Sequence, residues 1–282
     1  MQTSSPQTEE VTCEDGELLS WQQDTVTRYA CLNYPAQADS ADYQWPMIVY
    51  LHGSLRDPSS LYGVGENLFD LRDDYQLSDD AKVNGFIILS PEGRRATPYS
   101  GDGPATGEGF HWDEWYRNPD ENLDAQAIDH FIDQVVSTGK VDQSRIYVFG
   151  WSNGAYMTVL YSTWRSSKIA AMGQYAGADP WSRTPCPVPM SYTRQVPLIL
   201  LRNLCDKLVP CSTTNDWIDT LQGRDWPFEY HSLEASGKIV SSDNCSTSST
   251  CSGDVGLSIH FRWPDQAALE TVLEFFKKYS LE

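Results

Sequence analysis

The sequence predicts an α/β fold with a doubly wound, mostly parallel sheet that carries helices on both faces. Four nearly uninterrupted apolar runs indicate strands that are buried on both sides, at residues 47–51, 85–90, 146–149 and 196–201. Segments with helical patterning or with turn residues separate these runs. Apolar strands that alternate with helices are typical of a parallel sheet whose two faces are both covered.

Local patterns predict the remaining elements. Residues 12–33 include a stretch of alternating polar and apolar side chains, which indicates one or two antiparallel strands. Residues 123–138 place apolar side chains on one helical face and end at a glycine, as an amphipathic helix does. Further strands are expected at 169–176 and 228–233, and further helices at 155–164, 216–221 and 266–279.

Length and composition predict one folded unit. The chain has 282 residues, of which 40% are hydrophobic, and this is enough to bury a large core. The sequence has no internal repeat, linker or second apolar core, so we expect a single domain over residues 11–282 after a flexible tail at 1–10. The connection at 177–195 is too short to form a folded lid, and we expect no large lid domain.

The charge balance excludes several classes of partner. The chain carries 39 acidic and 20 basic residues, a formal net charge of −19, which disfavours nucleic-acid backbones and anionic membrane surfaces. No apolar run approaches the roughly 20 residues that a membrane-spanning helix needs. No cysteine or histidine cluster has zinc-site spacing. We therefore expect a monomer with no nucleic-acid or membrane partner, no metal and no cofactor.

Seven cysteines indicate an oxidising compartment, because disulfides are rare in the cytosol. Three pairs are close in sequence, and we expect them to form bridges: Cys13 with Cys31, Cys205 with Cys211, and Cys245 with Cys251. An alternative joins Cys186 to Cys205 or Cys211. The first ten residues lack the apolar core of a signal peptide, so we expect a mature secreted or periplasmic protein whose signal has been removed.

A serine in a sharp turn is the strongest functional signal. Residues 145–157 read R-I-Y-V-F-G-W-S-N-G-A-Y-M, a buried strand followed by G-x-S-x-G and then by a helix-compatible run. This context predicts a nucleophile elbow, in which a strained turn points the serine hydroxyl out of the sheet. Glycines two residues to either side let the strand and helix cross closely. Ser152 is the predicted nucleophile.

A serine nucleophile also needs an acid and a base. Asp206 lies just beyond the strand at 196–201, at the sheet edge where carboxyl-end loops form sites, and Glu234 and Asp243 remain alternatives. In the chain order Ser, acid, His, the base follows the acid. This order leaves His231 and His260, and it excludes the histidines that precede Ser152. Of the two, His260 is favoured because it lies just ahead of the last helix, whereas His231 lies within an expected strand.

Several short blocks resemble one family of enzymes. The blocks are Leu-His-Gly at 51–53, Val-Asp-x-x-Arg-Ile-Tyr-Val at 141–148 leading into Gly-Trp-Ser-Asn-Gly-x-x-Met at 150–157, Asp-x-x-Val-Pro at 206–210, and a histidine near Trp-Pro at 263–264. Together they are similar to secreted polyhydroxybutyrate-depolymerase-like and feruloyl-esterase-like serine esterases of the α/β-hydrolase fold. The resemblance covers roughly residues 45 to 280. It implies a triad of Ser152, Asp206 and His260.

The resemblance also implies an oxyanion hole made by the backbone N–H of Asn153 together with that of Ser54 or Leu55. One departure concerns the base: the family often has Gly-His-x-Trp-Pro, whereas Ile-His-Phe-Arg-Trp-Pro at 259–264 places the histidine one residue further from the tryptophan. We further expect aromatic side chains on carboxyl-end loops to contact substrate, because aromatic faces suit feruloyl rings, aromatic polyesters or sugars. The expected substrate-binding residues are His52, Trp112, Trp115, Trp151, Trp181 and Trp263.

The leading functional hypothesis is a serine esterase that forms an acyl-enzyme on bulky or polymeric esters, of the feruloyl, aromatic or polyester type. A serine peptidase or amidase on the same fold is the enzymatic alternative. A catalytically inactive binding module that keeps only the scaffold is the third hypothesis, and it is disfavoured because Ser152, Asp206 and His260 occur in the expected order.

Overall fold

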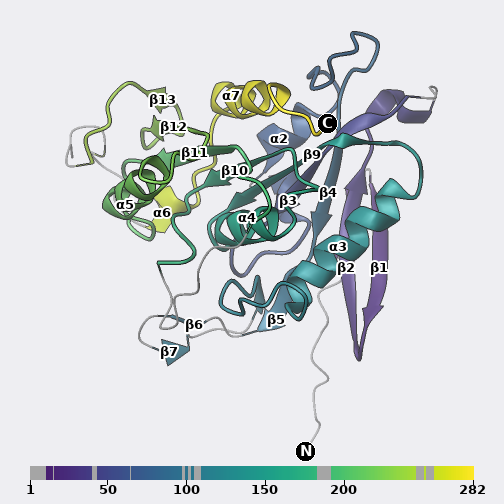
Figure 1. The fold of residues 1–282 in the computed structure, drawn as a ribbon, viewed down its shortest axis with the longest axis horizontal. Coiled ribbons are helices and arrows are strands. Elements are labelled where there is room, and N and C mark those ends of the chain that lie inside the picture. The colour runs from purple at the N-terminus through teal and green to yellow at the C-terminus, as the bar shows by residue number, and fades with distance from the viewer. Residues whose placement is uncertain are drawn as a thin grey trace, which may run out of the picture.

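One large sheet organises the molecule. A computed structural model describes residues 11–14, 16–39, 43–63, 65–96, 99–100, 103–104, 109–182, 192–245, 251 and 257–282. The expected tail at 1–10 and Cys186 lie outside the described residues. Within those residues, nine strands form a sheet in the order β1-β2-β4-β3-β9-β10-β11-β12-β13 (Figure 1). The six strands from β4 to β12 are parallel, whereas β1, β2 and β13 pair antiparallel at the two ends.

Four of the strands match the predicted apolar runs. Those of the large sheet are β1 (Glu17–Gln23), β2 (Val26–Asn33), β3 (Trp45–Leu51), β4 (Ile87–Pro91), β9 (Val141–Trp151), β10 (Ala171–Tyr175), β11 (Leu198–Asn203), β12 (Phe228–Leu233) and β13 (Ile239–Val240). All residues of β3, β4, β10 and β11 are buried, as expected of strands covered on both faces. Two small hairpins pair β5 (Arg94–Ala96) with β8 (Gly109–His111) and β6 (Tyr99–Ser100) with β7 (Gly103–Pro104).

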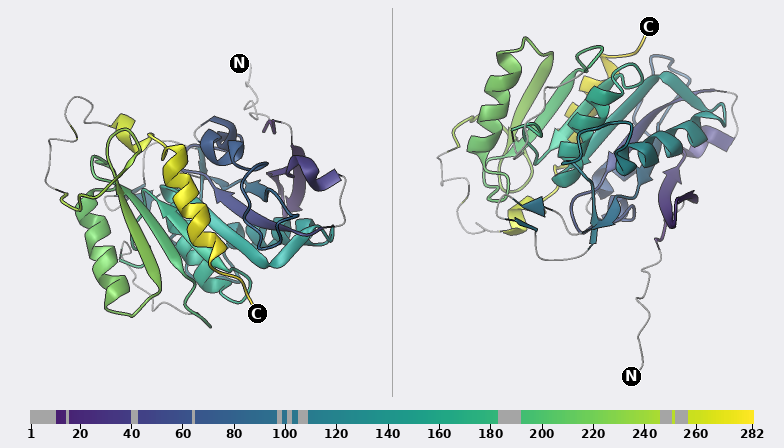
Figure 2. Two further views of the ribbon diagram at one scale, coloured as in Figure 1. Left: turned by 90° about the horizontal axis from the view of Figure 1, so that it is seen from above. Right: turned by 60° about the horizontal axis from the view of Figure 1, so that its bottom comes forward.

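Helices cover both faces of the sheet. On one face, α3 (Leu123–Val136), α4 (Asn153–Trp164) and α5 (Cys211–Gln222) contribute to one apolar cluster. On the other, α1 (Ser60–Gly63), α2 (Glu66–Asp70) and α7 (Gln266–Lys277) contribute to a second, and Figure 2 shows α7 lying across the sheet. The 3-10 helix η1 (Ala36–Asp39) precedes β3, and α6 (Leu257–His260) is a short helix that the sequence does not predict.

This arrangement confirms the predicted fold class, an α/β-hydrolase fold with a mostly parallel central sheet. The described residues between β10 and β11 form no helix. Among the helices of the described ranges, none is both long and apolar enough to cross a membrane. The described part of the chain also holds no group of three or more His, Cys, Asp or Glu side chains suited to a metal ion.

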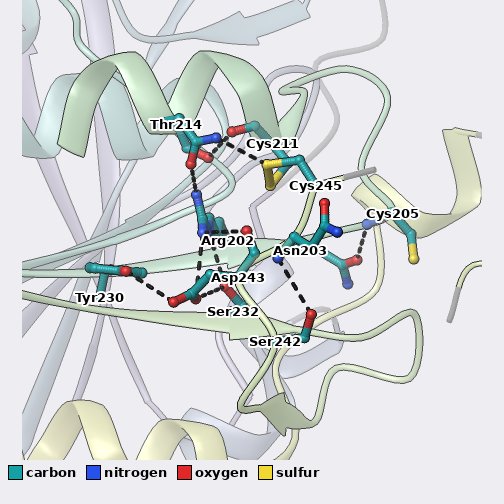
Figure 3. Close-up of a disulfide and its surroundings, with 12 residues drawn as sticks. Arg202, Asn203, Cys205, Cys211, Thr214, Tyr230, Ser232, Ser242, Asp243 and Cys245 are labelled. Atoms are coloured by element: carbon teal, nitrogen blue, oxygen red, sulfur yellow. Dashed lines mark hydrogen bonds and ion pairs between the residues drawn. A yellow bond between two sulfur atoms is a disulfide. The ribbon is translucent and has the colours of Figure 1, made fainter. Parts of the chain in front are cut away.

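The disulfides correct two of the three expected pairs. Cys13 is bonded to Cys31 as predicted, but Cys205 is bonded to Cys251 and Cys211 to Cys245. The predicted local pairs Cys205–Cys211 and Cys245–Cys251 are therefore wrong. The alternative that joined Cys186 to Cys205 or Cys211 is also wrong, because both of these cysteines are bonded elsewhere. Figure 3 shows the Cys205 sulfur apart from the Cys211–Cys245 bridge.

The reason for the different pairing is structural. Cys211 is the first residue of α5, whereas Cys205 follows β11 and is buried in a small cluster with Cys251 and Ile259. Cys205 and Cys211 are close in sequence, but they lie on different sides of the turn that contains Asp206.

Candidate active site

The turn between β9 and α4 holds Ser152 in an unusual backbone conformation. Its φ of 55° and ψ of −122° lie in a region that non-glycine residues rarely adopt. The Ser152 N–H donates to the carbonyl oxygen of Tyr175 at 3.0 Å, which ties the turn to the end of β10. The serine is half-buried, so the hydroxyl stays within reach of a bound molecule.

Close packing requires the two glycines that flank this serine. A Cβ atom on Gly150 would lie 2.3 Å from the carbonyl oxygen of Gly154, and one on Gly154 would lie 2.1 Å from that of Leu51. Real side chains do not approach backbone oxygens this closely. The G-x-S-x-G spacing therefore reflects the crossing of α4 over the ends of β3 and β9.

One chain of hydrogen bonds joins the three residues predicted to form a triad. The His260 Nε2 lies 2.7 Å from the Ser152 hydroxyl oxygen, and the His260 Nδ1 lies 2.7 Å from Asp206 Oδ2. With the carboxylate as acceptor, Nδ1–H donates to Asp206 and Nε2 accepts from the serine O–H. The imidazole and the carboxylate are both buried, at 3% and 5% exposed. This arrangement can move the serine proton to the imidazole.

The carboxylate of Asp206 is held by its own turn. Its Oδ1 accepts from the N–H groups of Leu208 and Val209 at 2.8 and 3.1 Å, which leaves Oδ2 for the imidazole. The two alternative acids are engaged elsewhere: Glu234 accepts from Ser236, and Asp243 joins a network with Ser232, Tyr230 and Arg202 (Figure 3).

The base is anchored to the sheet on its C-terminal side. The indole N–H of Trp151 donates to the carbonyl oxygen of His260 at 3.1 Å, and the Tyr175 hydroxyl donates to that of Arg262. The additional residue between the histidine and Trp-Pro is accommodated here, and the His260 ring still reaches both partners. His231, the alternative base, lies in β12, and its Nε2 is buried with no hydrogen-bond partner among the described residues.

Two backbone N–H groups are candidates to bind an oxyanion. Asn153 opens α4, and the first N–H groups of a helix lack intrahelical acceptors. Its side chain is already engaged, because Oδ1 accepts from the Trp112 N–H and Nδ2 donates to the Trp112 carbonyl. Ser54 and Leu55 were both predicted as the second donor. The Leu55 N–H already donates to the carbonyl oxygen of Phe110 at 2.9 Å, which leaves the N–H of Ser54 as the candidate.

His52 does not face a substrate, which corrects its expected role. The ring is fully buried, with Nδ1 2.8 Å from the Gly53 carbonyl oxygen and Nε2 accepting from the Gly93 N–H at 3.0 Å. Burial lowers the pKa of the imidazole to about 4. His52 is therefore a neutral structural residue that shapes the turn after β3.

Four of the five predicted tryptophans belong to the core, which corrects their assignment to substrate. The exposed fractions are 2% for Trp112, 1% for Trp151, and 8% for both Trp181 and Trp263. Trp112 donates to the His52 carbonyl, and Trp263 packs edge-on against four aromatic rings. Only Trp115 is partly exposed. Large aromatic rings fill the space beneath the carboxyl ends of the strands because strands buried on both faces need bulky cover there.

Three exposed apolar side chains lie close in sequence to predicted site residues, and two of them, Leu208 and Phe261, were not predicted as site residues. Leu55 is 59% exposed, Leu208 52% and Phe261 42%. Each lies within two residues of a predicted site residue, and the Arg56 guanidinium lies 5.6 Å from the centre of the Phe261 ring. Phe261 is one of the two residues between His260 and Trp263, where the family often has one, and this additional residue was the available sequence signal.

Comparisons with known proteins agree with this geometry. A family profile described as phospholipase/carboxylesterase matches residues 77–235, which is more than half of the chain. No curated protein matches the sequence significantly. Among solved structures, a thermostable esterase is similar with a TM-score of 0.64 and 18% identity, over 94% of this chain and 63% of that one.

Two other solved structures are also similar in fold. A ferulic acid esterase has a TM-score of 0.61 and 12% identity, over 93% of this chain and 96% of that one. The acylaminoacyl peptidase of Pyrococcus horikoshii has a TM-score of 0.57 and 14% identity, over 96% of this chain and 43% of that one. This chain thus spans less than two thirds of the thermostable esterase and of the peptidase. At these identities the similarities establish the fold alone.

Proposed function

This chain belongs to the phospholipase/carboxylesterase family, and we propose that it is a serine carboxylic-ester hydrolase that works through an acyl-enzyme. One observation carries the proposal: the hydrogen-bonded chain from Asp206 through His260 to Ser152, with the serine on a strained turn. A buried carboxylate, an imidazole and a serine hydroxyl in this order are the groups that acyl transfer requires.

The geometry supports a two-step reaction. His260 Nε2 accepts the Ser152 proton while the serine oxygen attacks the ester carbonyl, and Asp206 stabilises the imidazolium that forms. The N–H groups of Asn153 and Ser54 are the proposed donors to the oxyanion. The imidazolium then protonates the leaving alcohol. A water molecule, deprotonated by His260, releases the acid from the acyl-enzyme and restores the serine.

We further propose bulky or polymeric esters, of the feruloyl, aromatic or polyester type, as substrates. The exposed apolar side chains of Leu55, Leu208 and Phe261 beside the site would contact an apolar or aromatic acyl group. The similarity in fold to a protein described as a ferulic acid esterase is consistent with this class but does not define it. Three disulfides favour a secreted or periplasmic location, where such polymers occur outside the cell.

A serine peptidase or amidase is the second candidate, because the peptidase of Pyrococcus horikoshii is similar in fold. An amide needs efficient protonation of a poor leaving group, and the same His260 would have to supply that proton. A catalytically inactive binding module does not require a serine hydroxyl that is hydrogen-bonded to an imidazole. It is therefore the least favoured of the three hypotheses.

A fluorophosphonate probe tests the proposal. We expect one equivalent to attach to Ser152, as mapped by mass spectrometry, and the Ser152→Ala variant to remain unlabelled. Wild type should then hydrolyse p-nitrophenyl esters much faster than the matching p-nitroanilides. If the probe failed to label Ser152, the serine mechanism would be wrong. Faster turnover of the anilides than of the esters would favour the amidase. A panel of methyl ferulate, hydroxybutyrate oligomers and short aliphatic esters would identify the preferred class.

A further inference from the structure

The proposed acid and base come from separate loops, and a disulfide joins those loops beside both residues. Asp206 follows β11, whereas His260 ends α6. Cys205 immediately precedes Asp206, and it is bonded to Cys251, on the chain that leads to α6. The covalent link between the two loops therefore lies next to the contact between the carboxylate and the imidazole.

This bridge is packed against the residue before the base. Cys205, Cys251 and Ile259 form a buried cluster of their own, apart from the two large clusters of the sheet, and Ala235 packs at its side. Ile259 is 1% exposed and Cys205 is 4% exposed. Buried apolar contacts thus connect Cys205, which precedes Asp206, with Ile259, which precedes His260. A displacement of one would displace the other.

Hydrogen bonds secure the opposite side of the base. The carbonyl oxygens of His260 and Arg262 accept from Trp151 and Tyr175, both at the ends of central strands. On the N-terminal side of α6, the attachment that the described residues show is the Cys251 bridge together with the burial of Ile259. The loop of His260 is therefore held from two sides, by side-chain hydrogen bonds to its carbonyl oxygens and by a covalent link before α6.

We propose that the Cys205–Cys251 bridge, with Ile259 against it, is a positioning element that keeps the Asp206 carboxylate and the His260 imidazole at hydrogen-bonding distance. The proposal rests on the proposed serine-esterase function. It assigns to the bridge an effect on turnover that is separate from its effect on folding. Catalysis depends steeply on such distances, since a shift of about 1 Å at a reacting group can cost about a hundredfold in rate.

The other two bridges provide matched controls. Cys211–Cys245 joins the start of α5 to the chain after β13, beside the network of Arg202 and Asp243 (Figure 3), and neither cysteine is in the cluster with Ile259. Cys13–Cys31 ties the N-terminal segment to β2 near the far end of the sheet. Loop-closure entropy varies only with the logarithm of loop length, so sequence separations of 46, 34 and 18 predict similar losses of stability.

The test compares three double variants: Cys205→Ser with Cys251→Ser, Cys211→Ser with Cys245→Ser, and Cys13→Ser with Cys31→Ser. All three should lower the melting temperature by similar amounts. We expect the first to lower kcat on a short p-nitrophenyl ester, and the rate of fluorophosphonate labelling, by about tenfold to a hundredfold. The other two should change both by less than about threefold. Equal losses of turnover in all three would overturn the proposal.

A positioning role makes one further demand that a general structural role does not. If the bridge acts through the contact between Asp206 and His260, its removal should have little further effect once that contact is already lost. In an Asp206→Asn background, the Cys205→Ser with Cys251→Ser change should therefore lower kcat by less than about twofold. An undiminished loss in that background would contradict the proposal.

The covalent link can be separated from the apolar packing. Cys205→Ala with Cys251→Val keeps apolar side chains against Ile259 without a bond, and we expect its kcat to stay as low as that of the serine pair. Full recovery of kcat would show that packing suffices and would overturn the role of the bridge. These outcomes are distinct from failure of the proposed function, in which the wild type itself would neither turn over esters nor label at Ser152.

Discussion

The two halves of the candidate site are built in different ways. Ser152 is positioned by the backbone of central strands, with glycines where α4 crosses β3 and a left-handed φ at the serine. Asp206 and His260 are positioned by loops, through hydrogen bonds to neighbouring N–H groups and a disulfide between distant residues. The nucleophile thus depends on steric constraints where α4 crosses the ends of the central strands, whereas the acid and base depend on links between loops. Each half should fail in its own way.

The largest effect is expected at the base. His260→Ala should lower kcat by about four orders of magnitude or more, because no group remains to take the Ser152 proton, and should leave the fold intact. His231→Ala is the control, since it removes a half-buried histidine that has no contact with the serine. Steady-state kinetics and circular dichroism measure the two outcomes. If His231→Ala were the inactive variant, the assignment of the base would be wrong.

Gly154→Ala should damage the other half of the site through stability. Its new Cβ would lie 2.1 Å from the Leu51 carbonyl oxygen, so α4 or the end of β3 must shift, at a cost of about 3 kcal/mol. Urea unfolding measures this loss. The control is Gly63→Ala, where no atom lies within 4 Å of the added Cβ and stability should change by less than about 1 kcal/mol. Equal stability of the two variants would contradict the steric account of the turn.

A smaller effect is expected on the pH dependence of the unfolding free energy, through His52 at the end of β3. Burial lowers the pKa of His52 from 6.5 to about 4, so this neutral imidazole contributes stability above pH 6.5. The contribution is lost as the pH falls from 6.5 towards 4, because only the unfolded chain binds the proton in that range. Between pH 7 and pH 4.5 the wild type should therefore lose about 2 kcal/mol more unfolding free energy than His52→Gln does. Parallel curves for the two proteins would show that His52 does not titrate as proposed.

The same contrast between local and distant constraints explains which features of the fold and the site could be predicted from the sequence. The fold and the turn at Ser152 were accessible because apolar runs and the G-x-S-x-G spacing are local signals. Chain order, together with their places after an expected strand and ahead of the last helix, selected Asp206 and His260, which the structure brings together. Two of the three disulfides were mispredicted because proximity in sequence is a poor guide once α5 begins at Cys211 and separates it from Cys205.

Five of the six residues predicted to bind substrate are buried, for a related reason. A tryptophan near the carboxyl end of a strand can face solvent or fill the core, and the sequence pattern does not distinguish the two. Trp112, Trp151 and Trp263 point inwards because the turn after β3 and the loop of His260 need bulky packing. Exposed apolar residues such as Phe261 and Leu208 were missed because only the folded loops bring them to the edge of the site.

The most direct test of the central claim is a double-mutant cycle on Ser152 and His260. If the two act as one catalytic unit with Asp206, either alanine variant alone should remove nearly all turnover above the background rate. The Ser152→Ala, His260→Ala double variant should then be no slower than either single variant. The measurement is kcat on one p-nitrophenyl ester, with each variant checked for native melting. Losses that multiply in the double variant would mean that the two residues act independently, and would contradict the account.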